Sequence, residues 1–148
     1  MTLYTDGASR GNPGPAGIGV ILLDNDNVVY QGCEYLGEKT NNEAEYLALI
    51  YGLEEASKHT KKLKVFSDSL LLVSQIKGDF KIKKDNLKTL HARVKELTKL
   101  FDYFTISHTY RENNKKADKM ANTAIDEFTD GKRQIKTFDF LYCQDKLF

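Results

Sequence analysis

Four acidic side chains stand where carboxylates could do chemistry. Asp6 ends a strand-like segment just before a stretch rich in Gly and Pro, and Asp68 ends a later strand. Parallel neighbouring strands end at the same sheet edge, so we expect these two acids to lie together. Glu45 shares a small, apolar helix face, and Asp118 lies at the edge of the last helix's apolar face. Each acid alone has a structural explanation, as a turn residue, a helix-rim residue or a partner of the helix dipole.

Together, the four carboxylates would repel one another strongly unless cations lay between them. Mg²⁺ is a hard ion that prefers oxygen ligands and keeps positions open for water and phosphate, and Mn²⁺ could substitute for it. Two such ions about 4 Å apart can clamp an in-line phosphodiester displacement, one activating water and the other stabilising the leaving oxygen. The sequence has no Ser-His-Asp order and no Walker loop, so covalent catalysis and nucleotide hydrolysis are poorly supported.

The charge distribution fits a polyanionic substrate. The 148 residues carry a net charge of +1, but residues 58–116 hold 15 Lys or Arg against 6 Asp or Glu, whereas residues 1–57 hold 2 against 9. An acidic cluster beside a basic middle is what a metal-dependent enzyme acting on a polyanion needs. A solvated, lysine-rich helical face explains the basic half equally well.

Apolar periodicity predicts the elements that would position these acids. The expected order is three strands, a helix, a strand, two helices, a strand and a helix. The first three strands should form an antiparallel meander with a turn at 24–27, and the other two should run parallel to the first, which gives an α/β layer fold. The strands are expected over 2–8, 16–24, 28–36, 63–67 and 103–109, and the helices over 41–58, 70–77, 86–101 and 114–128.

Turn and cap signals set the boundaries. Residues 5–17 contain four glycines and both prolines, which predicts a turn with exposed backbone rather than helix or mid-strand. Thr40 and Glu43 have the spacing of a capping box that starts the first helix. Asp85 is expected to cap the helix over 86–101.

The length suits one domain over 1–130, followed by a tail over 131–148 whose apolar residues should pack on that domain. No apolar run approaches the length of a membrane span, and the N-terminus has no signal-peptide pattern. Cys33 and Cys143 match no metal spacing, and two free thiols are favoured over a bridge between them. We therefore expect a cytoplasmic monomer with no membrane contact.

The four acids lie in four short motifs, which are Thr5-Asp6-Gly7 with Gly11-Asn12-Pro13-Gly14, Thr40-Asn41-Asn42 with Ala44-Glu45, Ser67-Asp68-Ser69, and Arg111-Glu112-Asn113-Asn114-Lys115-Lys116-Ala117-Asp118. With these motifs the chain resembles type 1 ribonuclease H over roughly residues 1–128. The resemblance implies a ribonuclease H-like fold, with a five-stranded mixed sheet and helices on both faces. It also implies cleavage of the RNA strand of RNA–DNA hybrids with divalent metal, leaving 5′-phosphate and 3′-hydroxyl ends.

The resemblance also implies roles for single residues. The four acids would be the ligands of two Mg²⁺ ions. Three asparagines would contact the hybrid in the minor groove, where the 2′-hydroxyl distinguishes RNA from DNA. Thr40 would help hold a DNA-strand phosphate, Ser69 would join the substrate contacts, and Asn114 matches a polar position one turn before the last acid. The metal ligands would be Asp6, Glu45, Asp68 and Asp118, and the asparagines Asn12, Asn41 and Asn42.

The chain departs from the family pattern in three places. Leu70 stands where many members have Gln, so one substrate hydrogen bond is missing or comes from elsewhere. Residues 78–84 are too short for the basic, Trp-bearing protrusion of many members. A smaller phosphate-binding substitute would come from Lys77, Lys81, Lys83 and Lys84. His108 has the spacing of the family's mobile catalytic His, yet its surroundings predict strand rather than loop.

Two other functions compete with a compact ribonuclease H that lacks the protrusion. A nucleic-acid-binding module could keep the fold without catalysis, but four retained carboxylates would only repel a polyanion unless they held metal. A transposase or resolvase core is the second alternative, which the short chain and the Thr40-Asn41-Asn42 segment disfavour.

Overall fold

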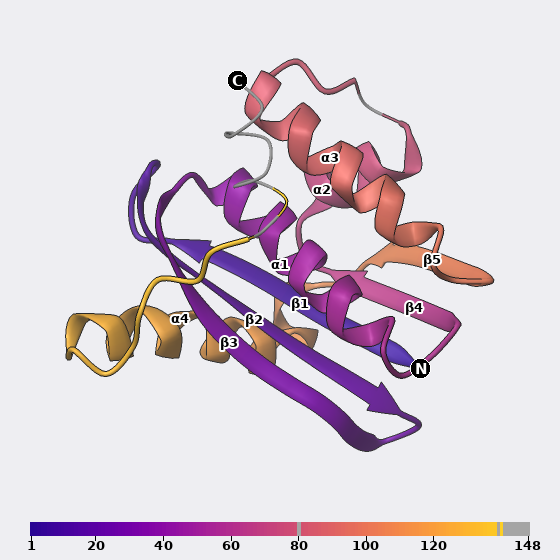
Figure 1. Cartoon of the computed structure of the whole chain (residues 1–148), viewed down its shortest axis with the longest axis horizontal. Helices are drawn as coiled ribbons and strands as arrows, with labels where there is room; N and C mark the ends of the chain where they lie inside the picture. Colours follow the sequence, from indigo (N-terminus) through magenta and orange to yellow (C-terminus); the bar gives the residue numbers. More distant parts are fainter. Residues whose placement is uncertain (80, 139, 141–148) are drawn as a thin grey trace.

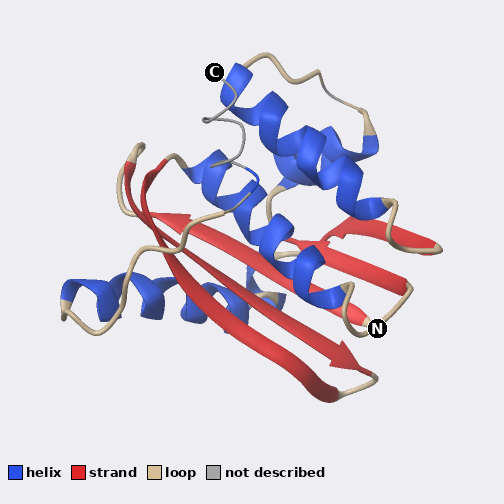
Figure 2. Cartoon of the chain, viewed as in Figure 1, coloured by secondary structure: helices blue, strands red, loops and turns tan. Residues whose placement is uncertain are grey.

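The computed structural model describes residues 1–79, 81–138 and 140. Within them, five strands and four α-helices follow one another in the predicted order, and a short 3₁₀ turn precedes the last helix (Figures 1 and 2). The elements are β1 (Thr2–Ser9), β2 (Gly14–Asp24), β3 (Asn27–Lys39), α1 (Asn41–Ala56), β4 (Lys62–Ser67), α2 (Leu70–Lys77), α3 (Asp85–Thr98), β5 (Tyr103–His108), η1 (Arg111–Asn113) and α4 (Lys115–Thr129).

The strands form one mixed sheet in the order β3-β2-β1-β4-β5. β1 and β2, and β2 and β3, are antiparallel, while β4 runs parallel to β1 and β5 parallel to β4. Asn25, with a φ of 54°, makes the tight turn between β2 and β3, because Asn tolerates the left-handed region. The predicted α/β fold, with three antiparallel and two parallel strands, is confirmed.

Helices cover both faces of the sheet (Figure 1). α1 packs on β1 and β2, α3 packs on α1, and α2 contacts β4 and β5, all on one face. α4 covers β1, β2 and β3 from the opposite face. The core between α1 and the sheet is built from side chains with at most 1% exposure, such as Leu3, Leu22, Leu47 and Leu63.

Within the glycine-rich stretch over 5–17 the turn is shorter than predicted, because both flanking strands extend farther into it. β1 continues to Ser9 and β2 begins at Gly14, which leaves a loop of only four residues. A Cβ on Gly17 would lie 2.2 Å from the carbonyl oxygen of Ala121 in α4, and one on Gly19 would lie 2.3 Å from that of Ala117. Glycine is required here because the helix backbone rests directly on the strand.

The helix boundaries confirm one predicted cap and contradict another. Thr40 caps α1 with the full capping box, since its hydroxyl accepts from the Glu43 N–H and the Glu43 carboxylate accepts from the Thr40 N–H. Asp85 is not the cap of α3, because Lys84 holds that position and Asp85 is the first helical residue. The Asp85 carboxylate is fully exposed and lies 3.6 Å from Lys88 Nζ instead of accepting from the backbone.

The C-terminal segment packs on the domain as far as the structure describes it. The Lys136 N–H donates to the Tyr35 carbonyl at 2.7 Å, so the segment pairs with the edge strand β3. Arg133 lies 3.2 Å from Glu127, and Phe138 is only 7% exposed. Phe140 is half-buried and stands edge-on to Phe138, with the Arg93 guanidinium over its ring. Leu141 and Tyr142, which the prediction also named, and Cys143 with its possible bridge lie outside the described residues.

Among the helices of the described residues, none combines the length and the apolarity needed to cross a bilayer.

Candidate active site

The ends of two parallel strands bring the first pair of acids together. Thr5 of β1 pairs with Ser67 of β4, so Asp6 and Asp68 follow at the same level on adjacent chains. Glu45 joins them from α1, and one carboxylate oxygen from each of the three acids lies within 4.8 Å of the other two. The pairing of β1 with β4 therefore brings Asp6 and Asp68 together, as the strand order predicts.

A backbone donor holds Glu45 in this cluster. The Gly7 N–H donates to Glu45 Oε1 at 2.5 Å. A Cβ on Gly7 would lie 2.3 Å from the carbonyl carbon of Ala44, so only glycine allows α1 to approach the end of β1 this closely. Gly7 thus fixes both the position of α1 and the orientation of the Glu45 carboxylate.

The fourth acid reaches the site from the other face of the sheet. Asp118 lies in the first turn of α4, it lines the same hollow as Asp6, and its presence helps to raise the pKa of Asp6. Asn114, which is 2% exposed, fixes the start of this helix, because its Nδ2 donates to the Thr5 carbonyl at 2.8 Å. Asn114 therefore ties α4 to the strand that carries Asp6.

Burial makes this cluster costly in the absence of a cation. Asp6 and Glu45 are 5% and 8% exposed. Desolvation raises the pKa of Asp6 to about 10, with further contributions from the charges of Glu45 and Asp68. Desolvation also raises the pKa of Glu45 to about 8, although the Gly7 N–H and the Arg111 charge oppose it. Clustered carboxylate oxygens that resist ionisation fit a hard divalent cation, which would supply the missing positive charge.

The acids line an open hollow of about 350 Å³ at the end of the sheet. The structure brings three of the predicted substrate residues to the same hollow, since Asn41, Asn42 and Ser69 also line it. Asn12 lies beside them, because its Oδ1 accepts from the Asn41 N–H at 3.1 Å. Thr40 is half-buried next to Asn41, and its hydroxyl is engaged in capping α1.

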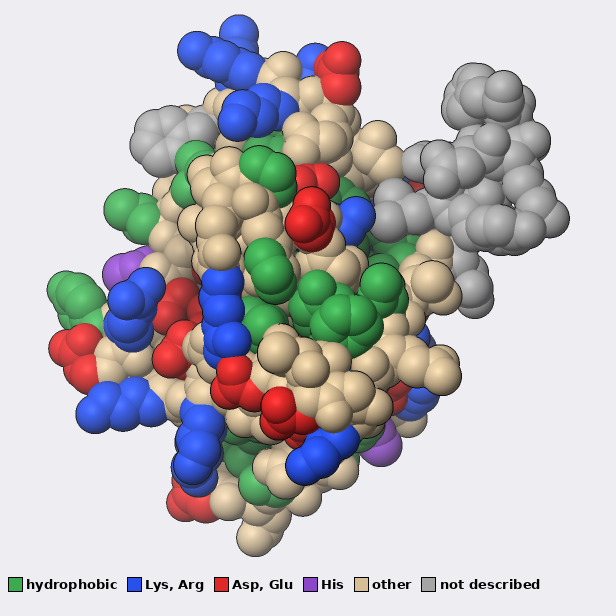
Figure 3. All heavy atoms as spheres, turned by 90° about the vertical axis from the view of Figure 1, so that its left-hand side faces the viewer, with side chains coloured by type: hydrophobic (Ala, Val, Ile, Leu, Met, Phe, Trp, Pro, Cys, Tyr) green, Lys and Arg blue, Asp and Glu red, His purple; other side chains and the backbone are tan. Residues whose placement is uncertain are grey.

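Other predicted residues lie away from this hollow. His108 is the last residue of β5, where it is exposed and stands edge-on to Tyr110, and it does not line the hollow. Lys81, Lys83 and Lys84 are exposed in the segment before α3. Figure 3, which faces the left-hand end of Figure 1, shows Lys and Arg side chains gathered at the top, at the height of α3, and mixed with Asp and Glu below.

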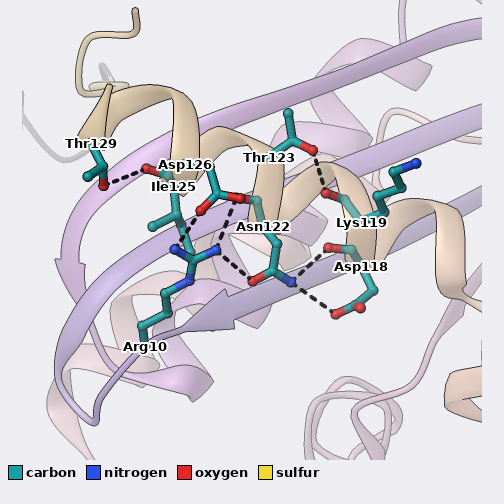
Figure 4. Close-up of polar contacts among 8 residues, drawn as sticks. All are labelled: Arg10, Asp118, Lys119, Asn122, Thr123, Ile125, Asp126 and Thr129. Atoms are coloured by element: carbon teal, nitrogen blue, oxygen red, sulfur yellow. Dashed lines mark hydrogen bonds and ion pairs between the residues drawn. The ribbon is translucent and has the colours of Figure 1, made fainter. Parts of the chain in front are cut away.

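Sequence reasoning gave no role to two basic residues near the acids. Arg111 lines the hollow, and its charge lowers the pKa of Glu45. Its signal was its place in the same motif as Asp118, seven residues earlier. Arg10 lies beside the C-terminal half of α4, where it contacts Asn122 and Asp126 (Figure 4). No local pattern pairs Arg10 with residues more than a hundred positions away.

Comparison with known proteins gives consistent relatives. The sequence model of a family described as "Reverse transcriptase-like" matches residues 4–124. A ribonuclease HI of Halobacterium salinarum is 40% identical over 126 residues, which make up 84% of this chain and 63% of that protein, so the chain spans less than two thirds of this relative. A ribonuclease H of Brucella anthropi is 34% identical over 146 residues, covering 88% of this chain and 93% of that protein.

A solved structure has the same fold. LC11-RNase H1, isolated from compost by a metagenomic approach, has been crystallised in complex with an RNA/DNA hybrid. It is 38% identical, with a TM-score of 0.83 over 86% of this chain and 98% of that one.

Proposed function

Because this chain belongs to the ribonuclease H family, we propose that it is a metal-dependent endonuclease that hydrolyses the RNA strand of RNA–DNA hybrids and leaves 5′-phosphate and 3′-hydroxyl ends. The observation that carries the proposal is the cluster formed by buried Asp6 and Glu45 and half-buried Asp68, with Asp118 lining the same hollow. The hybrid bound to the related LC11-RNase H1 supports the choice of substrate. A cytoplasmic location and a monomeric state stay predictions.

The four acids would hold two Mg²⁺ ions, or Mn²⁺ in their place. When bound, such ions activate a water molecule and stabilise the leaving oxygen of a phosphodiester. The chain contributes a fixed geometry: Gly7 orients Glu45 through its N–H, and Asn114 holds the helix of Asp118 against β1. Burial of Asp6 and Glu45 limits the water that could screen their charges, which strengthens their attraction for a cation.

The rim of the hollow would select the hybrid. Asn41, Asn42 and Ser69 line the hollow together with the acids and offer short polar groups, which suit contacts to the 2′-hydroxyls and base edges of RNA. Asn12 would extend this surface through its hydrogen bond with Asn41. Thr40 would contact a phosphate of the DNA strand next to them.

Charged and titratable groups outside the cluster would assist. Arg111 lines the hollow and offers a guanidinium for a phosphate oxygen. Lys81, Lys83 and Lys84 would hold phosphates farther along the duplex. His108 would assist proton transfer or product departure, which requires it to approach the substrate from its exposed place at the end of β5.

A gel assay of hybrid cleavage tests the proposal. The wild-type chain should cut the RNA strand in Mg²⁺, stop when EDTA is added, and leave a plain DNA duplex intact. Asp6→Asn should lose at least about 10³-fold in rate, because loss of one shared ligand removes several kcal/mol of metal-derived stabilisation. A wild type that binds the hybrid but cuts it in neither Mg²⁺ nor Mn²⁺ would favour a non-catalytic binding module, and cleavage by Asp6→Asn would place the site elsewhere.

A further inference from the structure

A row of polar contacts joins the loop after β1 to the fourth acid (Figure 4). Arg10 Nη1 lies 2.7 Å from Asp126 Oδ1, and Arg10 Nη2 donates to both Oδ1 and the carbonyl of Asn122 at 3.3 Å. The Asn122 Nδ2 then donates to the Asp118 carbonyl at 3.1 Å and lies 3.5 Å from Asp118 Oδ1. These contacts connect the strand that carries Asp6 to the helix that carries Asp118.

The chemistry of Arg10 fixes which way the Asn122 amide points. A guanidinium only donates hydrogen bonds, so it must meet the amide oxygen of Asn122. The amide NH₂ group therefore faces Asp118, where both the carbonyl and the carboxylate accept. In the opposite orientation the amide oxygen would face the carboxylate, which is unfavourable. Arg10 thus selects the amide orientation that supplies donors to the fourth acid.

Asn114 ties the start of α4 to β1 through the helix backbone, and α4 has no side-chain cap of its own. Asn122, one turn after Asp118, adds a donor to the Asp118 carboxylate itself. A small slide of the helix along the strand would move Asp118 away from Asp6. Arg10 comes four residues after Asp6, directly after β1, so its contact with Asn122 links the position of α4 to that of β1.

We propose that Arg10 and Asn122 are positioning residues, which hold the Asp118 carboxylate next to Asp6 and thereby raise the affinity of the acidic cluster for its divalent cations. This inference rests on the proposed function of the cluster. Partners that orient a metal-binding carboxylate commonly change metal affinity or activity by 10–100-fold when removed. The alternative is that the same contacts only tether the helix.

The ion pair with Asp126 allows the two roles to be separated. The Arg10 and Asp126 side chains are 42% and 62% exposed, so this pair belongs to the class that contributes little to stability. Asp126→Asn removes the charge of the tether but leaves the contacts of Arg10 and Asn122 in place. It is the matched control, because it lies on the same helix, one turn after Asn122.

The experiment measures cation binding directly. The full chain without nucleic acid is titrated with Mn²⁺ by calorimetry, and the Mg²⁺ dependence of hybrid cleavage is measured in parallel. Asn122→Ala should weaken Mn²⁺ binding about tenfold and shift the cleavage curve to higher Mg²⁺ by a similar factor, with cleavage recovered at high Mg²⁺ and the KM for the hybrid unchanged. Arg10→Ala should act in the same direction, and Asp126→Asn should stay within about twofold of wild type.

The outcomes are distinguishable. An Asn122→Ala variant that binds Mn²⁺ as the wild type does, with only a lower melting temperature, would overturn the positioning role. Equal losses of Mn²⁺ affinity in Asp126→Asn and Asn122→Ala would also overturn the positioning role, and would show that the contacts only tether the helix. If Asn122→Ala does not fold, Arg10→Ala decides the question, since it leaves the helix sequence intact. A wild type that neither binds Mn²⁺ nor cuts the hybrid would instead overturn the proposed function.

Discussion

Replacing one buried carboxylate should stabilise the cation-free protein, and the gain should grow with pH. Burial and the neighbouring acids raise the pKa of Asp6 to about 10, and burial raises that of Glu45 to about 8. In the unfolded chain both groups ionise near pH 4, at about 3.9 and 4.3. Between about pH 5.5 and pH 7.5 the folded protein therefore keeps two protons that the unfolded chain has lost, so its stability falls as pH rises.

The slope follows from the number of protons. Each proton bound only by the folded state changes the free energy of unfolding by about 1.4 kcal/mol per pH unit. The wild type should lose stability by about 3 kcal/mol per pH unit, and Asp6→Asn by about half of that, because only Glu45 still holds an extra proton. Across the window the variant should gain up to about 3 kcal/mol on the wild type, or roughly 5–10 °C in melting temperature for a chain of this size.

Urea unfolding in EDTA at several pH values measures this difference. Asp26→Asn in the exposed turn between β2 and β3 is the control, and it should keep the wild-type slope. Mg²⁺ added at about 100 times its dissociation constant should stabilise the wild type by about 2.7 kcal/mol and Asp6→Asn far less. A wild-type stability that does not change with pH in EDTA, or an Asp6→Asn variant that gains nothing, would refute the account of the cluster as buried acids that need a cation.

Three further predictions concern the surroundings of the site. Changing Lys81, Lys83 and Lys84 together to Ala should raise the KM for the hybrid and flatten its salt dependence while sparing kcat, and an unchanged salt slope would remove these lysines from the binding surface. His108→Ala should slow turnover by roughly 10²-fold with cation binding intact if the side chain acts in proton transfer, whereas full activity would assign it a structural role. Deleting 132–148 should lower the melting temperature, because it removes the 7% exposed Phe138 from the core, and an identical melting curve would contradict this packing.

The sequence alone determined the order of the elements, and it predicted four acids that the structure places around one hollow. Strand and helix periodicities depend on neighbours a few residues apart, so the pattern of apolar residues was sufficient for the mixed sheet. The Thr40 cap is equally local, since both of its partners lie within one turn. Asp85 shows the limit of such signals. Asp is a common N-cap residue, but α3 begins at Asp85 itself, and the exposed carboxylate lies near Lys88 instead of capping the helix.

Only the tertiary structure decided how the acids are held. Gly7 and Gly17 are needed because each meets helix backbone that is distant in sequence, which their composition as turn residues does not reveal. Arg111 enters the hollow, and Arg10 reaches Asn122, through contacts that no sequence spacing encodes. The physical reason is that a carboxylate's neighbours depend on sheet register and on how closely each helix approaches the sheet. Those distances follow from packing of the whole chain and not from any local pattern.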